Sequence, residues 1–250
     1  MTDAATLATP APRALDGLRR AVIDERDGPL PALLIALTVL AGVVDAISIL
    51  ALGHVFVAAM TGNLVFIGLG AAGAEGFAVS TCALALGGFV VGALAGGRAC
   101  RAGRSHRGRA LRNVLGIKLV LSAAVMLVAV LTADPLPRAS RDTMVVLLAM
   151  SMGAQLAAIR YLKVPDLLTV VLTLTITGAL TDRGLGPFHP VMVRRGLSVV
   201  AFAVGAMSAA LLVLYVSLTA ALALGLAIIV GAAIAAQVVS RSAAGWAAPR

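Results

Sequence analysis

The chain is a succession of apolar stretches, most of them long enough to cross a membrane, separated by short polar connections. A helix needs about 20 apolar residues in a row to span a bilayer. Eight stretches approach or exceed this length: residues 30–53, 55–74, 77–97 and 113–133 in the first half, and 143–159, 167–181, 196–217 and 219–239 in the second. The pattern predicts an all-α integral membrane protein, and a composition of 60% hydrophobic and 12% charged residues agrees with it.

Two of the eight stretches contain residues that do not suit a helix surrounded by lipid. Residues 55–74 carry Thr61, Gly62 and Asn63 in succession, and residues 167–181 are short and rich in threonine. Irregular backbone at membrane depth is tolerated only where protein or a water-filled cavity satisfies its polar groups. We therefore expect six transmembrane helices plus two re-entrant or broken segments, which enter the membrane and return to the side from which they came.

The distribution of positive charge favours six crossings over eight. The net charge is +9, and six arginines lie in one basic loop, residues 98–112. Positively charged loops remain on the cytoplasmic side of a membrane. With a cytoplasmic N-terminus, six crossings place this loop inside, whereas eight place it outside. We also expect the loop to attract anionic lipid headgroups, while the lack of interleaved aromatic residues argues against nucleic acid as a partner.

The chain is predicted to have a cytoplasmic polar tail (1–29), one polytopic membrane domain (30–240) and a short C-terminal tail (241–250). No apolar region with a small-residue cleavage site precedes the first span, so we expect no removable signal peptide. Within the domain, the halves 30–133 and 143–240 both run span, interrupted segment, span, span. With three crossings per half, this order predicts a 3+3 inverted repeat, which is the plan of many secondary transporters.

Two motifs resemble those of a known family. They comprise Gly42, Asp45, Ala46, Phe56, Met60, Thr61, Gly62 and Asn63 in the first half, and Met152, Gly153, Gln155, Val164, Pro165, Asp166 and Thr169 in the second. Over roughly residues 33–240 the chain resembles the YoaK family of bacterial inner-membrane proteins, domain of unknown function 1275. Leu156 departs from the family pattern, in which Asn is expected after the Gln. The resemblance implies a multi-pass protein of the bacterial plasma membrane; by the charge rule both termini are cytoplasmic. It implies no activity.

Asp45 is the only acidic residue inside a long predicted span. A carboxylate in lipid is costly and is by default a functional candidate, here as the carrier of a proton or cation. The alternative is a structural role, in which Asp45 caps the free N–H groups of a broken helix. The same alternatives, a substrate path or hydrogen bonds between helices, apply to other polar residues: Thr61, Gly62, Asn63 and Gln155.

Further candidate residues lie elsewhere in the predicted spans. Thr173 and Thr177 belong to a stripe of threonines spaced four residues apart, which either lines a polar path or bonds back to helix carbonyls. His54, at the outer end of the first span, is a candidate for gating by protonation, and the alternative is an ordinary interfacial histidine. At the inner end of the fifth span, Arg160 is a candidate to pair with Asp166 or to hold an anion, and the alternative is that its charge only sets the topology.

Two expectations concern helix packing and the one lysine inside a span. Lys118 lies five residues into its span and is expected to extend back to the cytoplasmic surface. Gly88, Gly92 and Gly96 are spaced to form a face of small residues, which predicts close packing against a neighbouring helix.

The sequence contains no phosphate-binding glycine loop, no metal-ligand cluster and no nucleophile and base that could meet within the membrane. We therefore expect neither an enzyme nor a bound cofactor or metal. The predicted function is a small-solute or ion transporter or channel with a polar intramembrane site. The competing class is a non-transporting membrane scaffold or accessory subunit, whose polar residues would be paired internally. The solute is unknown, and a homo-oligomer stays open.

Overall fold

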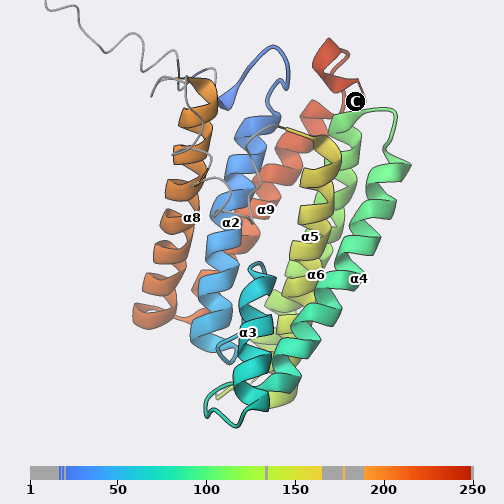
Figure 1. Ribbon diagram of the computed structural model, residues 1–250. Coiled ribbons are helices and arrows are strands. Elements are labelled where there is room, and N and C mark those ends of the chain that lie inside the picture. The colour runs from blue at the N-terminus through green and yellow to red at the C-terminus, as the bar shows by residue number, and fades with distance from the viewer. Residues whose placement is uncertain are drawn as a thin grey trace, which may run out of the picture.

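The computed structural model describes residues 17, 19, 21–132, 135–164, 177 and 189–248. Six helices in this part of the chain are long and apolar enough to cross a bilayer, as the sequence predicts. They form one bundle (Figure 1) and comprise α2 (Leu30–Ala51), α4 (Val79–Ala102), α5 (Arg107–Leu131), α6 (Arg138–Leu162), α8 (Pro190–Tyr215) and α9 (Leu218–Val239). A shorter helix, α3 (Met60–Ala71), and one 3-10 turn, η1 (Gly245–Ala247), accompany them.

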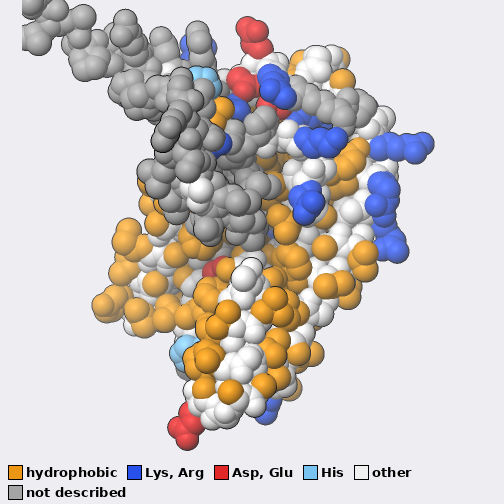
Figure 2. Space-filling model, in the orientation of Figure 1, with side chains coloured by type: hydrophobic (Ala, Val, Ile, Leu, Met, Phe, Trp, Pro, Cys, Tyr) orange, Lys and Arg blue, Asp and Glu red, His pale blue; other side chains and the backbone are white. Residues whose placement is uncertain are grey.

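The outer surface of the bundle is apolar along its middle. Large hydrophobic side chains are exposed on several helices, among them Val90, Leu127, Met207 and Ile234. Figure 2 shows hydrophobic side chains over the middle of one face, with Lys and Arg side chains gathered toward one end. A surface of this kind fits a bilayer, because apolar side chains face the lipid and charged ones lie at the polar interface.

The two ends of the bundle differ in charge, and we name them by their residues. The basic end contains residues 24–29, the 98–112 loop, residues 162–164 and residues 240–248. The α3 end, at the bottom of Figure 1, contains residues 51–54, 71–78, 135–138 and 215–218. The basic loop and the start of α2 therefore lie at the same end, as the arrangement with six crossings requires.

Helix α3 does not cross the bundle. After α2 ends, residues 52–59 run back into the interior, and α3 then returns to the α3 end (Figure 1). Its 12 residues extend about 18 Å, well short of the roughly 30 Å hydrocarbon core of a bilayer. The expectation that residues 55–74 enter and return is thus confirmed. The second such segment, 167–181, lies outside the described residues except for Thr177.

The helices α2 and α8 pack through close backbone contacts at glycine. A methyl group added to Gly42 of α2 would lie 2.1 Å from the carbonyl oxygen of Phe202 in α8. A methyl group added to Gly205 of α8 would lie 2.0 Å from the carbonyl oxygen of Val39 in α2. Both positions require glycine because the two backbones touch, which is a common way for helices to associate within lipid.

The helices α6 and α4 repeat this contact. A methyl group on Gly153 of α6 would lie 2.1 Å from the carbonyl oxygen of Phe89 in α4, and one on Gly92 of α4 would lie 2.0 Å from that of Met150 in α6. In both helix pairs, the glycine of one helix contacts a carbonyl oxygen of the other helix. That carbonyl belongs to the residue three positions before the contact glycine of the other helix. Because α2 and α6 cross in opposite directions, as do α4 and α8, the two halves pack as an inverted repeat.

The third long helix of each half, α5 or α9, completes the inverted repeat. Helix α5 packs against α9 and α6, and α9 packs in the equivalent way against α5 and α2. The small-residue face of α4 behaves as predicted, since Gly88, Gly92 and Gly96 are all buried against α6. The interior of the bundle therefore lies between α2, α5, α6 and α9.

Lys118 does not extend to the membrane surface, so that prediction is wrong. Its side chain is fully buried, and Nζ donates to the carbonyl oxygen of Ser151 at 3.2 Å and to its Oγ at 3.0 Å. The sulfur of Met152 lies 3.7 Å from the same Nζ. The reason is that Lys118 lies on the face of α5 that packs against α6, so the side chain finds partners in the core and has no path along the lipid.

Candidate functional site

Asp45 holds the backbone of the chain where it re-enters the bundle. Its Oδ1 accepts hydrogen bonds from the amides of Val57 at 2.9 Å and Ala58 at 2.7 Å, which precede α3. The residue is only 4% exposed. Its second oxygen, Oδ2, is buried and accepts no hydrogen bond from any residue that the structure describes. Asp45 therefore caps an irregular segment through Oδ1, and the amide of Ala59 also interacts with its carboxylate.

Asn63 fixes the same segment from the other side. Its Oδ1 accepts from the amide of Phe56 at 2.9 Å, and its Nδ2 donates to the carbonyl oxygen of Phe56 at 2.7 Å. The Asn63 side chain thus bonds both the N–H and the C=O of Phe56, as the opposite residue does in a hydrogen-bonded pair of an antiparallel sheet. Gly62 is needed beside them, because a methyl group there would lie 2.5 Å from the Phe56 ring. The polar triplet in the apolar segment is thus explained by the loop that it holds.

The re-entrant segment satisfies its backbone within the protein, as membrane depth demands. Val57 and Ala58 are buried, so their amides cannot bond to water or lipid. Asp45 accepts from both of these amides, and Asn63 accepts from the amide of Phe56. Thr61 behaves differently, since its side chain is exposed and makes no hydrogen bond within the described residues.

Gln155 lies in the second half and bonds to the first. It is fully buried in α6, and its Nε2 donates to the carbonyl oxygen of Leu37 in α2 at 3.1 Å. Leu37 precedes Asp45 by about two helical turns, or roughly 12 Å along α2. The structure therefore does not bring Gln155 and Asp45 to one point, although both lie in the interior.

The remaining candidates do not gather around Asp45. His54 is exposed at the α3 end, and Arg160 is exposed near the basic end, so the two lie at opposite ends of the bundle. Thr177 is exposed. Thr173 and Asp166 lie outside the described residues, and with them the predicted pair of Arg160 and Asp166.

A small cavity lies at the centre of the bundle, between α2, α5, α6 and α9. Its volume is about 20 Å³, enough for about one water molecule, and its lining is apolar apart from Ser122. Val44 and Ile47 line it, whereas Asp45 faces the re-entrant segment. Two larger hollows, of about 530 and 250 Å³, open at the α3 end and share Arg141 as a lining residue.

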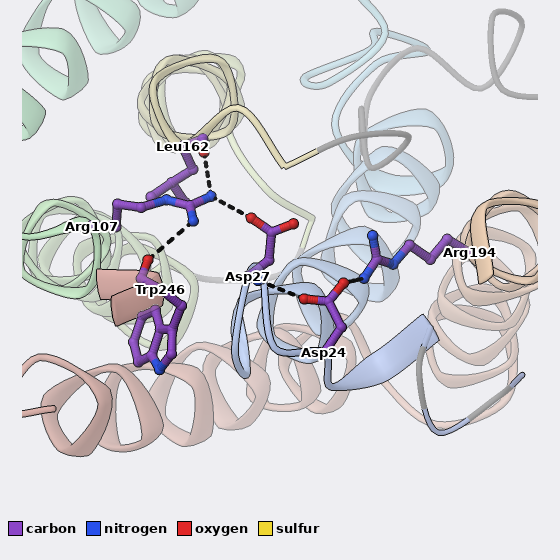
Figure 3. Close-up of polar contacts among 6 residues, drawn as sticks. All are labelled: Asp24, Asp27, Arg107, Leu162, Arg194 and Trp246. Atoms are coloured by element: carbon purple, nitrogen blue, oxygen red, sulfur yellow. Dashed lines mark hydrogen bonds and ion pairs between the residues drawn. The ribbon is translucent and has the colours of Figure 1, made fainter. Parts of the chain in front are cut away.

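Sequence reasoning missed a buried ion pair at the basic end. Figure 3 shows Arg107 of α5 pointing toward Asp27, with Nη2 and Oδ1 2.8 Å apart. The same Nη2 donates to the carbonyl oxygen of Leu162 at 2.6 Å, and Nη1 donates to that of Trp246 at 3.2 Å. Both charged side chains are almost completely buried. One arginine thus connects the segment before α2 with the end of α6 and with the C-terminal segment.

A second ion pair lies beside the first. Arg194 of α8 pairs with Asp24, and its Nε donates to the carbonyl oxygen of Ala21 at 2.8 Å. The other oxygen of Asp24 accepts from the amide of Asp27 at 2.5 Å (Figure 3). Residues 24–29 belong to the predicted cytoplasmic polar tail, and within this stretch Asp24, Asp27 and Gly28 pack into the basic end, whereas Glu25 and Arg26 are exposed. The signal that could have found them is the group of three acidic residues, Asp24, Glu25 and Asp27, immediately before the first span of a chain that otherwise has an excess of arginine.

The Asp24 pair should make stability depend on pH. Burial raises the pKa of Asp24, but the amide of Asp27 and the guanidinium of Arg194 lower it by more, so the pKa lies below its ordinary value of 3.8. A lowered pKa means that the contribution to stability is complete above pH 3.8 and is lost as the pH falls through the folded-state pKa. The variant Asp24→Asn should therefore melt below the wild type at pH 7, and this difference should shrink below pH 3.8.

This pH dependence is measurable from the fluorescence of Trp246, the only tryptophan, during thermal unfolding. The exposed neighbour Glu25 provides a control, since Glu25→Gln should melt like the wild type near pH 7. If the difference in melting temperature between Asp24→Asn and the wild type stayed constant from pH 7 to pH 3, the contribution of the ionised Asp24 to stability would be contradicted.

Comparison with known proteins agrees with this architecture. The family described as "Protein of unknown function (DUF1275)" matches residues 33–236. The chain belongs to this family. One relative, "UPF0700 transmembrane protein YoaK" of Bacillus subtilis (strain 168), is 29% identical over 187 residues, which cover 72% of this chain and 82% of that protein. No solved structure matches the chain significantly. The resemblance to the YoaK family is confirmed, and the family brings no established activity with it.

Proposed function

We propose that the protein is a non-enzymatic transporter or channel that moves a small solute or ion across the bacterial plasma membrane, with its basic end in the cytoplasm. The observation that carries the proposal is the repeated contact of α2 with α8 and of α6 with α4 between halves that cross in opposite directions. Inverted repeats of this kind allow two equivalent conformations, one open to each side of the membrane.

The two ends of the bundle fit one such conformation. At the basic end, the pairs of Asp27 with Arg107 and of Asp24 with Arg194 tie the segment before α2 to α5 and α8. At the α3 end, two hollows open toward the surroundings. A state closed at the basic end and hollowed at the other is what alternating access requires, and release of the ion pairs would accompany the opposite state.

The interior supplies ionisable groups for such a path. Asp45 has a buried oxygen without a hydrogen bond from the described residues, which could hold a proton or a cation. Lys118 lies one helical turn from Ser122, the polar residue of the central cavity. In this proposal Thr61, Gly62 and Asn63 shape the re-entrant segment beside the path, while Gln155 ties the halves together.

The competing function is a non-transporting scaffold or accessory subunit. One observation favours it: Asn63 and one oxygen of Asp45 are fully used in holding the re-entrant segment. Their polarity is then explained without any solute. The two functions differ in whether the centre of the bundle ever meets water.

Accessibility of Ser122 distinguishes these functions without knowledge of the solute. In a Cys82→Ala, Cys100→Ala background, Ser122→Cys in sealed vesicles should react with a charged, membrane-impermeant thiol reagent from at least one side. The matched control is Ala123→Cys, next to it in α5 but exposed on the outer surface, where lipid should exclude the reagent.

Reaction of the thiol at 122 but not at 123 would support transport, and dependence of that reaction on Asp45→Asn would assign the carboxylate a part in it. Protection of both thiols from both sides would favour the scaffold.

A further inference from the structure

The two hollows at the α3 end meet at Arg141, in the first turn of α6. The smaller one, of about 250 Å³, is lined by the end of α2, the start of α4 and the start of α6. The larger one, of about 530 Å³, extends toward the connection between α8 and α9. Arg141 therefore lies where helices of both halves converge, beside space large enough for a small ligand or a polar headgroup.

The other charged residues of the smaller hollow already have partners. Arg138 pairs with Asp142, with Nε and Oδ2 3.7 Å apart, and donates to Ser80 at 2.8 Å. The other oxygen of Asp142 accepts from the hydroxyl of Thr81 at 3.0 Å. Among the described residues that line this hollow, two arginines and one aspartate leave an excess of one positive charge.

Arg141 carries that excess charge and has no partner among the residues that the structure describes. Its side chain is half-buried, and its Nε is buried without a hydrogen bond. Its guanidinium makes neither a hydrogen bond nor an ion pair with the described residues. A partly buried arginine has five N–H donors to satisfy, and leaving them unsatisfied is costly. The geometry thus presents a guanidinium, ready to donate, to a hollow that is open to the surroundings.

We propose that Arg141 binds a carboxylate or phosphate group in the hollow at the α3 end. The planar guanidinium matches both groups through two parallel hydrogen bonds, which an ammonium cannot reproduce. The hydroxyl of Thr81 lies on the same wall. This site does not depend on the transport function: it serves as an entry site if the protein transports an anion, and as a lipid or ligand site if it does not.

The anion has two sources, a dissolved molecule or the phosphate of a lipid headgroup, and one assay separates them. The full-length protein is purified in an uncharged detergent, and its unfolding is followed with a thiol-reactive dye, since Cys82 and Cys100 are 2% and 1% exposed in the folded state. Sodium phosphate, succinate or a short-chain phosphatidylglycerol is then titrated at constant ionic strength.

An anion bound at the site should raise the melting temperature by about 3 °C or more at ten times its Kd. This shift should disappear in Arg141→Gln and persist in Arg101→Gln, which removes the same charge from an exposed position at the basic end. If Arg141→Gln does not fold, Arg141→Lys keeps the charge without the planar fork and should weaken binding at least several-fold.

The outcomes are distinct. A shift with phosphate or succinate that requires Arg141 supports a dissolved anion, and one that occurs only with the phospholipid and requires Arg141 supports a headgroup. No shift with any of the three probes, or equal shifts in wild type, Arg141→Gln and Arg141→Lys, would overturn the proposal. None of these results depends on whether the protein transports a solute.

Discussion

Gly92→Ala should lower the stability of the protein by about 3 kcal/mol or more, the upper part of the range for overpacked sites. For a chain of this size that corresponds to a fall in melting temperature of roughly 6–12 °C. The added methyl group would lie 2.0 Å from the carbonyl oxygen of Met150 and 2.6 Å from its Cα. These are backbone atoms and cannot rotate away, so α4 and α6 must separate along their whole contact.

The helix itself provides the control for this prediction. Gly87 lies on α4, five residues earlier, and a methyl group there would meet no described residue within 4 Å. Gly87→Ala should therefore be neutral or slightly stabilising, because alanine favours a helix more than glycine does. Melting temperatures in detergent, read with the thiol-reactive dye, compare the two variants. Similar melting temperatures for Gly87→Ala and Gly92→Ala would contradict the close backbone packing of α4 against α6.

The inverted repeat requires the same result in the other half. Gly205→Ala should destabilise the protein about as much as Gly92→Ala, since its methyl group would meet the carbonyl oxygen of Val39 at 2.0 Å. The matching control on α8 is Gly196→Ala, where a methyl group would meet no atom of the structure's described part within 4 Å. A tolerated Gly205→Ala beside a damaging Gly92→Ala would show that the two contacts are not equivalent.

Asp45→Ala should destabilise the protein by about 2–6 kcal/mol, because it leaves two buried amides without acceptors at about 1–3 kcal/mol each. These amides belong to Val57 and Ala58, which lie in the apolar interior and have no access to water. The re-entrant segment would lose the attachment that draws it toward α2. Thermal unfolding measures the loss of stability, and accessibility of a cysteine at position 58 to a thiol reagent measures the release of the segment.

Asp45→Asn separates the structural role from the charge. The amide oxygen still accepts the two hydrogen bonds, so this variant should retain most of the stability that Asp45→Ala loses. A nearby control is Ser48→Ala, since the buried Ser48 hydroxyl bonds only to the carbonyl oxygen of Asp45 within its own helix, at 3.0 Å, and should contribute little. Equal stability of Asp45→Ala and Asp45→Asn would mean that Oδ1 does not hold the segment.

The part of the candidate site that lies in the first half of the chain could be predicted in part from the sequence. The sequence marks Asp45, Gly62 and Asn63 as unusual because polar and flexible residues are rare in apolar stretches, and all three act on the re-entrant segment. Their partners could not be predicted, since Val57, Ala58 and Phe56 contribute only backbone groups that every residue has. A backbone hydrogen-bond partner does not depend on residue type. A sequence motif can therefore identify the polar side chain without showing which backbone group it bonds.

The positions of the six spans and the return of residues 55–74 follow from sequence alone. Crossing a bilayer depends on length and hydrophobicity, which are local properties, and the basic loop at residues 98–112 determines which arrangement of crossings is consistent. The faces by which helices meet do not follow in this way. A helix that is apolar around its whole circumference gives no sign of which side is buried.

Only the tertiary structure could therefore show that Lys118 lies in the core and that Asp24 and Asp27 are packed against arginines of α8 and α5. It also shows that Arg141, between two hollows, has no partner in the described part of the chain. Each of these depends on contacts between residues far apart in the chain. The charge of a side chain is set by the sequence, but whether that charge is paired, buried or left facing open space is decided by the helices that pack around it.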